Sequence, residues 1–260
     1  MEKNSPHLLS AQKDKPVLVF IHYFGGAAQS WKWVIDILSP EYYCVALSLP
    51  GFGNNPIAQK PSVDYYSSYI QQELITLGIK EYVLIGHSMG GKIALQVALN
   101  EQHEKNIQQL ILLAPSPPTV ERMPEREKER MLQHPNEEVE KETVRKITVG
   151  NLTDEQFALA VHTQSIINNR VWRWWILEGM NTPLSSETKQ LTLPIALISS
   201  IDDPSITPEM IQQETMPNLP PQTQLMMYKK IGHLYPLEEP EWLSYMIHYT
   251  IKKAGVLHTY

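Results

Sequence analysis

Six short apolar runs, separated by segments with helical periodicity, restrict this chain to very few folds. The runs cover residues 16–22, 43–50, 82–87, 110–115, 194–200 and 224–230, with a further edge strand expected at 8–11. They are continuous rather than alternating, which is typical of parallel strands that helices bury on both faces. Helical periodicity occupies residues 30–38, 63–77, 90–100, 208–215 and 241–253. This order predicts an α/β fold with a mostly parallel central sheet and helices on both faces.

The alternation is interrupted once, between the strands expected at 110–115 and 194–200. With 260 residues, the chain is long enough for one large domain that carries an insertion. We therefore expect an α/β core over residues 1–118 and 191–260 and a helical cap, or lid, over 119–190. Helices within the cap are expected in the charge-dense stretch 120–147 and over 153–168 and 170–179.

Composition excludes several classes of partner. Lys and Arg number 22 against 28 Asp and Glu, and no basic stripe occurs that could neutralise a run of phosphates, so nucleic acid is not an expected partner. No stretch approaches the roughly 20 apolar residues that span a bilayer, and the N-terminus lacks the apolar segment of a signal peptide. The single cysteine, Cys44, cannot form an intrachain disulfide. We expect a cytoplasmic protein with no membrane partner, no cofactor and, for want of ligand spacing, no metal.

The motif GHSMG, residues 86–90, lies between the apolar run 82–87 and the helical segment 90–100. A sharp turn from strand to helix holds a serine in a strained conformation, and only glycine fits two residues to either side. Ser88 would then lie at a helix N-terminus, where free N–H groups favour negative charge on a nearby oxygen. This context predicts Ser88 as a nucleophile and the Met89 N–H as an oxyanion donor. The alternative is a glycine-rich turn with an incidental serine.

A second glycine-rich loop, HYFGG at residues 22–26, follows the first strong strand and precedes a helix. Such a loop can offer another backbone N–H near Ser88, and two donors of this kind stabilise a developing oxyanion by several kcal/mol. Phe24 is the expected donor. The loop also serves as a strand-to-helix turn, whether or not it has this role.

A histidine and two aspartates follow the last two apolar runs. His233, in IGHLYPLEEP, lies at the end of the final run, where an imidazole can reach Ser88 and accept its proton. Asp202 and Asp203 follow the run before it, and either carboxylate could orient the imidazole. Asp203 is preferred as the catalytic acid and Asp202 is the alternative. The chain order Ser88, Asp203, His233 differs from the orders in chymotrypsin and subtilisin.

Together these motifs resemble the α/β-hydrolase family, in particular its small esterase-like serine hydrolases with the nucleophile elbow GHSMGG. HYFGG resembles the family's H-G-x-G-G oxyanion loop, SLPGFG at 48–53 its D-x-P-G-F-G turn, and IGHLYPLEEP its G-H-x-x-x-x-E-x-P ending. The acid loop resembles G-x-x-D-x-x-x-P, which makes Asp203 the acid, although the proline comes one residue late. Tyr23 and Ser48 depart from the family, where glycine and aspartate stand. Serine at position 88 sets the chain apart from epoxide hydrolases and haloalkane dehalogenases, which use aspartate there.

The resemblance implies a cap that roofs the nucleophile and sets substrate size. Trp172 and Trp175 share one helix face in this segment, and with Tyr23 they are candidates for the substrate pocket, although such a cluster more often forms cap core. With the triad, this resemblance implies a serine esterase that cleaves a carboxylic ester or thioester through an acyl-enzyme, and an apolar pocket implies a small hydrophobic substrate. The alternatives are a carbon–carbon bond hydrolase or lyase on the same triad, and a non-enzymatic ligand-binding protein of the same fold.

Overall fold

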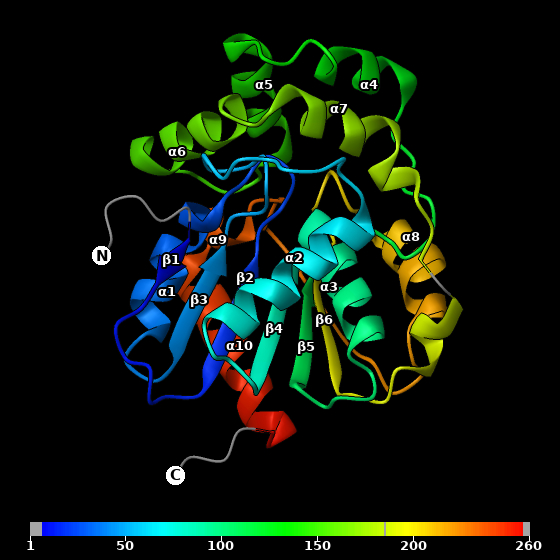
Figure 1. Cartoon of the computed structure of the whole chain (residues 1–260). Coiled ribbons are helices and arrows are strands. Elements are labelled where there is room, and N and C mark those ends of the chain that lie inside the picture. The colour runs from blue at the N-terminus through cyan, green and yellow to red at the C-terminus, as the bar shows by residue number, and fades with distance from the viewer. Residues whose placement is uncertain (1–6, 185, 257–260) are drawn as a thin grey trace.

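A seven-stranded sheet forms the centre of the computed structural model, which describes residues 7–184 and 186–256. The strands are β1 (Leu8–Leu9), β2 (Val17–Ile21), β3 (Tyr43–Leu47), β4 (Tyr82–His87), β5 (Ile107–Leu113), β6 (Ile195–Ser200) and β7 (Gln224–Tyr228). Their order is β1-β3-β2-β4-β5-β6-β7, and every neighbouring pair is parallel except β1 with β3. Figure 1 shows most of these strands side by side, with their carboxyl ends toward the top. The predicted mostly parallel sheet is confirmed.

Burial explains why the apolar runs are strands. Every residue of β3, β4 and β6 is buried, because helices cover both faces of the sheet. The edge strand β7 is half-buried. The strand expected at 43–50 ends at Leu47, and the one expected at 110–115 begins at Ile107, where pairing with Tyr82 starts.

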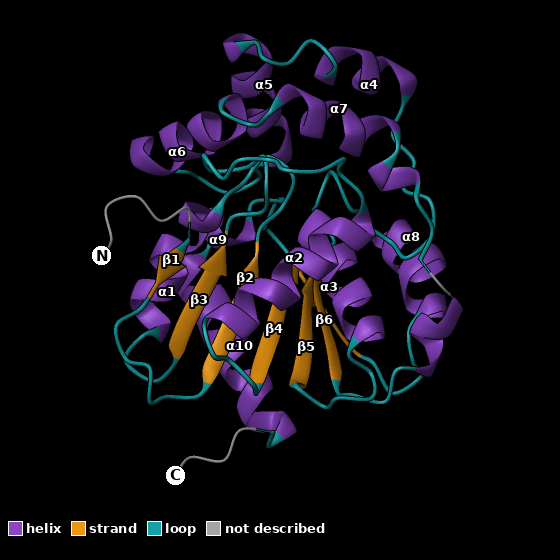
Figure 2. Cartoon of the chain, in the orientation of Figure 1, coloured by secondary structure: helices purple, strands orange, loops and turns teal. Residues whose placement is uncertain are grey.

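Helices form a layer on each face of the sheet (Figure 2). α2 (Val63–Thr76) and α3 (Met89–Asn100) pack together on one face, and α1 (Lys32–Leu38) and α10 (Pro240–Ala254) pack together on the other. The helix expected at 208–215 is irregular, since α8 (Pro208–Met210) continues as a π-helix at Ile211–Thr215. A short helix that the sequence did not predict, α9 (Tyr235–Glu238), precedes α10. This layering leaves the carboxyl ends of the strands available for a site.

In the described part of the chain, four α-helices between β5 and β6 lie above the carboxyl ends of the strands (Figure 1). These inserted helices are α4 (Glu125–Met131), α5 (Glu137–Ile147), α6 (Asp154–Ser165) and α7 (Asn169–Leu177). The charge-dense stretch 120–147 forms two helices rather than one. Pro135 disfavours helical backbone in the residue before it, and the Asn136 side chain begins α5 by accepting the N–H groups of Glu138 and Val139.

The residue limits expected for the core and for the cap stay predictions. The outer limits of the core, at residues 1 and 260, lie outside the described residues. Within the described ranges, no helix is long and apolar enough to cross a membrane.

Candidate active site

Ser88 lies between β4 and α3, at the carboxyl edge of the sheet. Its backbone has φ 55° and ψ −117°, a conformation that residues other than glycine rarely adopt. Close backbone contacts enforce it. A methyl group on Gly86 would lie 2.5 Å from the carbonyl oxygen of Gly90, and one on Gly90 would lie 2.6 Å from the carbonyl oxygen of His22. The glycines of GHSMG are therefore required by the tight turn.

Two loops bring an imidazole and a carboxylate to this serine. His233, in the loop after β7, has its Nε2 2.9 Å from Ser88 Oγ. Asp203, in the loop after β6, lies 2.9 Å and 3.1 Å from His233 Nδ1 through its two oxygens. Its Oδ1 also accepts the N–H groups of Ser205 and Ile206, which fixes the orientation of the carboxylate. The structure thus brings these three side chains together, with His233 between Ser88 and Asp203.

The neighbouring carboxylate of Asp202 has a different partner. Its Oδ2 accepts a hydrogen bond from the Lys230 N–H at 2.6 Å, in an exposed loop. The structure therefore brings Asp203, and not Asp202, to the imidazole. Adjacent residues of a turn point in different directions, so only one of the two carboxylates reaches His233.

The joined side chains are shielded from water, with exposed fractions of 8% for Ser88, 5% for His233 and 2% for Asp203. Burial has the largest single effect and lowers the pKa of His233, but the charge and hydrogen bond of Asp203, together with the charges of Glu121 and Glu238, raise the pKa above its ordinary value. A higher proton affinity makes the imidazole a better acceptor for the serine proton. His87, whose ring lies 5.2 Å from that of His233, is fully buried, and burial holds its pKa well below the usual value.

Two backbone donors near the serine are unused. Among the described residues, the N–H groups of Phe24 and Met89 have no hydrogen-bond acceptor. Met89 begins α3, and Phe24 belongs to the loop that contacts Gly90 through the His22 carbonyl. His22 fixes this loop, because its Nδ1 donates to the Tyr23 carbonyl at 2.8 Å while its Nε2 accepts a backbone N–H. Burial lowers the pKa of His22 to about 4, so the ring stays neutral.

Aromatic side chains of α7 lie against the same loop. Trp172 and Trp175 are buried, and their ring centroids lie 4.4 Å and 6.1 Å from that of Phe24. Trp172 Nε1 also donates to a backbone carbonyl of α4 at 2.7 Å, so this residue holds the inserted helices together as well. Tyr23, the third predicted pocket residue, is buried with its ring 5.2 Å from His87. The tryptophans therefore cover the loop, whereas Tyr23 packs against the elbow.

Two polar side chains that the sequence analysis missed lie beside Ser88 and His233. The loop after β5 passes Ser88, and the Ser116 N–H donates to the Ser88 carbonyl at 3.0 Å. The Ser116 hydroxyl and one carboxylate oxygen of Glu121 are buried, and the two side chains interact with each other. Burial raises the pKa of Glu121, and the Glu121 charge in turn contributes to the raised pKa of His233. Their position after a strand end was the only sequence signal for them.

A buried lysine ties the start of α3 to both ends of the inserted segment. Lys92 is fully buried, and its ammonium group donates to the carbonyl oxygens of Thr119 at 2.9 Å and Met180 at 3.1 Å. Thr119 precedes α4, and Met180 follows α7. One charged group therefore holds the inserted helices to the helix that carries Ser88.

Replacing Lys92 with methionine is expected to change how stability depends on pH. Burial lowers the pKa of Lys92 from 10.5 to about 8, so the folded protein binds this proton more weakly than the unfolded chain does. Stability from this group therefore rises with pH between about 8 and 10.5, by up to about 3 kcal/mol. Urea unfolding at pH 7 and pH 10.5 should show this increment in the wild type and in the exposed control Lys80→Met, but not in Lys92→Met. An unchanged increment in Lys92→Met would contradict the expectation.

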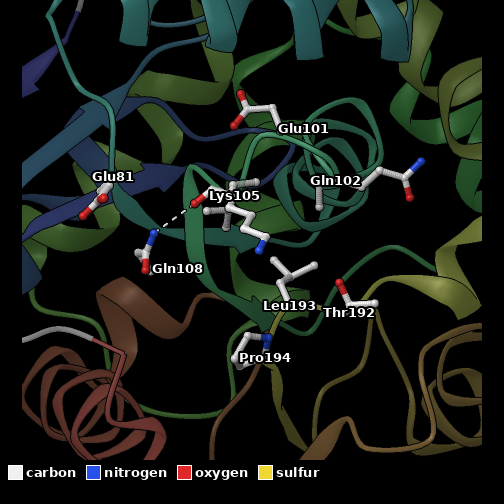
Figure 3. Close-up of a pocket in the computed structure, with 10 residues that line it drawn as sticks. Glu81, Glu101, Gln102, Lys105, Gln108, Thr192, Leu193 and Pro194 are labelled. Carbon is white, nitrogen blue, oxygen red and sulfur yellow. Dashed lines mark hydrogen bonds between the residues drawn. The ribbon is translucent and has the colours of Figure 1, made fainter.

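A cavity of about 450 Å³ lies elsewhere, at the amino ends of β4, β5 and β6 (Figure 3). Its lining includes Glu81, Glu101 and Lys105, and the Gln108 side chain donates to the Lys105 carbonyl at 3.0 Å. Ser88 lies at the opposite edge of the sheet, so this cavity is separate from the candidate site. No group of three or more His, Cys, Asp or Glu side chains in the described ranges is arranged to hold a metal ion.

Comparison with known proteins gives matches in sequence and in fold. The family model described as alpha/beta hydrolase fold matches residues 16–144, which include the motifs HYFGG and GHSMG. A curated relative, "Putative carbamate hydrolase RutD" of Escherichia coli O17:K52:H18, is 35% identical over 89 residues, 34% of this chain and 32% of that protein. The chain thus matches about a third of the length of this relative.

Solved structures match over nearly the whole chain. An esterase from Exiguobacterium antarcticum has a TM-score of 0.83 at 17% identity, with 95% of this chain and 94% of that chain covered. A membrane phospholipase A has a TM-score of 0.80 at 22% identity, with 96% and 83% covered. At these identities, the likeness shows that the fold is shared.

Proposed function

Because the chain belongs to the α/β-hydrolase fold family, we propose that it is a serine hydrolase that cleaves a carboxylic ester or thioester of a small hydrophobic substrate through an acyl-enzyme. One observation carries this proposal: Ser88 Oγ lies 2.9 Å from His233 Nε2, and Asp203 holds the other ring nitrogen. The fold alone supports many chemistries, so the assignment depends on this group of side chains.

In the proposed reaction, His233 Nε2 takes the Ser88 proton as Oγ attacks the carbonyl carbon. The N–H groups of Phe24 and Met89 donate to the oxygen that becomes negative. His233 then gives its proton to the leaving alcohol or thiol, and an acyl-enzyme remains. Water, deprotonated by the same imidazole, attacks the acyl group and frees Ser88. Asp203 keeps the hydrogen on Nδ1 and stabilises the imidazolium that forms.

The substrate class is inferred from the aromatic cluster of Phe24, Trp172 and Trp175. The two tryptophans pack on Phe24, the proposed oxyanion donor, and Ser88 is nearly inaccessible, which supports a small apolar acyl group. A carbamate carbonyl is attacked by the same steps as an ester carbonyl. Since one relative is named for carbamate hydrolysis, aryl carbamates belong in the substrate panel.

Among p-nitrophenyl esters, we expect kcat/KM to rise from acetate to butyrate and to fall for laurate. Each methylene buried against the aromatic cluster contributes about 0.8 kcal/mol, or roughly fourfold in kcat/KM, until no space is left for the acyl chain. Steady-state kinetics across the series measures this directly. A continuous rise through laurate would contradict a small site and would favour a lipid-like substrate.

Covalent labelling tests the proposed function without knowledge of the natural substrate. A fluorophosphonate probe should label the wild-type protein at Ser88, as peptide mass spectrometry would show, and the label should be absent from Ser88→Ala. Failure to label the folded wild type would favour the non-enzymatic alternative, in which the triad is vestigial and the fold binds a ligand.

A second candidate reaction, hydrolysis of a carbon–carbon bond next to a carbonyl, is favoured by one feature. The Ser116 hydroxyl and the Glu121 carboxyl are buried polar groups of the kind needed to bind an enol or a carbanion. Turnover of a vinylogous diketone, with rates on simple esters many orders lower, would favour this reaction over ester hydrolysis.

A further inference from the structure

The buried carboxylate of Glu238 accepts four backbone hydrogen bonds. Its Oε2 accepts from Val149 at 2.9 Å, Gly150 at 2.7 Å and Gly232 at 2.9 Å, and its Oε1 accepts from Leu234 at 2.9 Å. Bonds from N–H groups to a carboxylate are charge-assisted and roughly twice as strong as those between neutral groups. The side chain therefore fixes the backbone at four points.

Two of these points flank the candidate catalytic histidine. Gly232 and Leu234 donate to Glu238, and the N–H between them, that of His233, donates to the Ile147 carbonyl at 2.6 Å. Three consecutive N–H groups are held in this way, so the backbone that carries the imidazole cannot shift without breaking one of these bonds. A methyl group on Gly232 would lie 2.5 Å from the Ile147 oxygen, and only glycine permits this approach.

The other two donors to Glu238 lie in the loop between two of the inserted helices. Val149 and Gly150 connect α5 to α6, and Ile147 is the last residue of α5. Glu238 therefore joins the histidine loop to a segment more than 80 residues earlier in the chain. Its charge also acts on His233, whose pKa is raised by the carboxylates of Asp203, Glu121 and Glu238 against the effect of burial.

We propose that Glu238 is a positioning residue that keeps His233 aligned with Ser88 by binding the histidine loop to residues 147–150 of the inserted helices. This inference rests on the proposed function of His233 as the base. Because one carboxylate binds both segments, the position of residues 147–150 and the position of the histidine loop depend on each other. Glu238 contacts no reacting atom, so its loss acts through His233 and lowers kcat rather than raising KM.

E238Q tests this role with little change in side-chain size. Glutamine has no charge, and its NH₂ group must oppose at least one of the four N–H donors. We expect kcat for p-nitrophenyl acetate to fall about tenfold or more, with KM changed less than about threefold. The acid limb of the kcat/KM profile should move to lower pH, because the imidazole loses a neighbouring negative charge.

The matched control is E239Q, which removes the same charge from the adjacent, partly exposed side chain. Both kcat and the pH profile should stay as in the wild type. Equal profiles for E238Q and the wild type, or equal effects of E238Q and E239Q, would overturn the proposal.

A second pair of variants changes a donor to Glu238 instead of Glu238 itself, and it tests the same proposal if E238Q does not fold. V149P removes one N–H donor at an exposed side chain, and Thr148 before it has φ −99° and ψ 135°, which suits a residue that precedes proline. The loss of one bond should lower kcat about threefold to fivefold, whereas V149A, which keeps the donor, should not change it. Equal kcat in V149P and V149A would count against the coupling.

NMR separates failure of this inference from failure of the proposed function. A folded wild-type protein that neither hydrolyses acyl substrates nor reacts with the fluorophosphonate would refute the function. Titration of His233 in histidine-labelled protein needs no turnover, and its pKa should be lower in E238Q than in the wild type and in E239Q. An unchanged pKa would refute the role of Glu238 even if the protein is an active hydrolase.

Discussion

Ser88→Ala should lower kcat for short activated esters by about 10⁶-fold and leave the folded structure intact, because the variant lacks the oxygen that forms the acyl-enzyme. The elbow should survive, since the contacts that enforce φ 55° at this position come from Gly86 and Gly90 rather than from the hydroxyl. Residual catalysis would come from the two oxyanion donors. Single-turnover kinetics and circular dichroism on the same preparation measure both parts of the expectation.

Ser116→Ala is the matched control for this variant. Ser116 is a buried serine next to the elbow, and its contact with Ser88 is made by the backbone N–H, which alanine retains. We expect ester hydrolysis within about threefold of the wild type. A loss in Ser116→Ala as large as that in Ser88→Ala, or full activity in Ser88→Ala, would refute Ser88 as the nucleophile.

The sheet could be predicted because its signal is local. A strand covered on both faces must be apolar along its whole length, and β3, β4 and β6 are buried at every residue. The expected ends of the strands were wrong by a few residues where pairing decides them. Ile107 extends β5 because it pairs with Tyr82 across the sheet, and no pattern in either segment carries that information.

The position of the candidate site could also be predicted in part from the order of the strands. The carboxyl ends of parallel strands meet at one edge, so a serine, an aspartate and a histidine that each follow a strand are brought together there. The sequence preferred Asp203 to Asp202, but only the turn after β6 decides which carboxylate faces the imidazole. Glu121 could not be predicted, and although Glu238 stands at the glutamate of the G-H-x-x-x-x-E-x-P motif, its hydrogen bonds to residues 149 and 150 could not be predicted, because those donors are distant in sequence.

Asp203→Asn is expected to lower kcat about 10⁴-fold, whereas Asp202→Asn should leave it within about threefold of the wild type. The Asp203 carboxylate accepts the hydrogen on His233 Nδ1, and an asparagine NH₂ in its place would favour the tautomer that cannot accept the Ser88 proton. Asp202 bonds instead to the Lys230 N–H in an exposed loop. A large loss in Asp202→Asn with little loss in Asp203→Asn would exchange their roles.

The pH dependence of the residual activity gives an independent test of the same pair. The base must be neutral to accept a proton, so the wild-type rate falls as the pH drops through the His233 pKa. Asp203 raises this pKa and burial lowers it, so with the carboxylate removed the opposing effect of burial dominates. The acid limb of kcat/KM should therefore move to lower pH in Asp203→Asn and stay in place in Asp202→Asn. A shift in the opposite direction would mean that Asp203 does not stabilise the protonated imidazole, and the proposed triad would lose its acid.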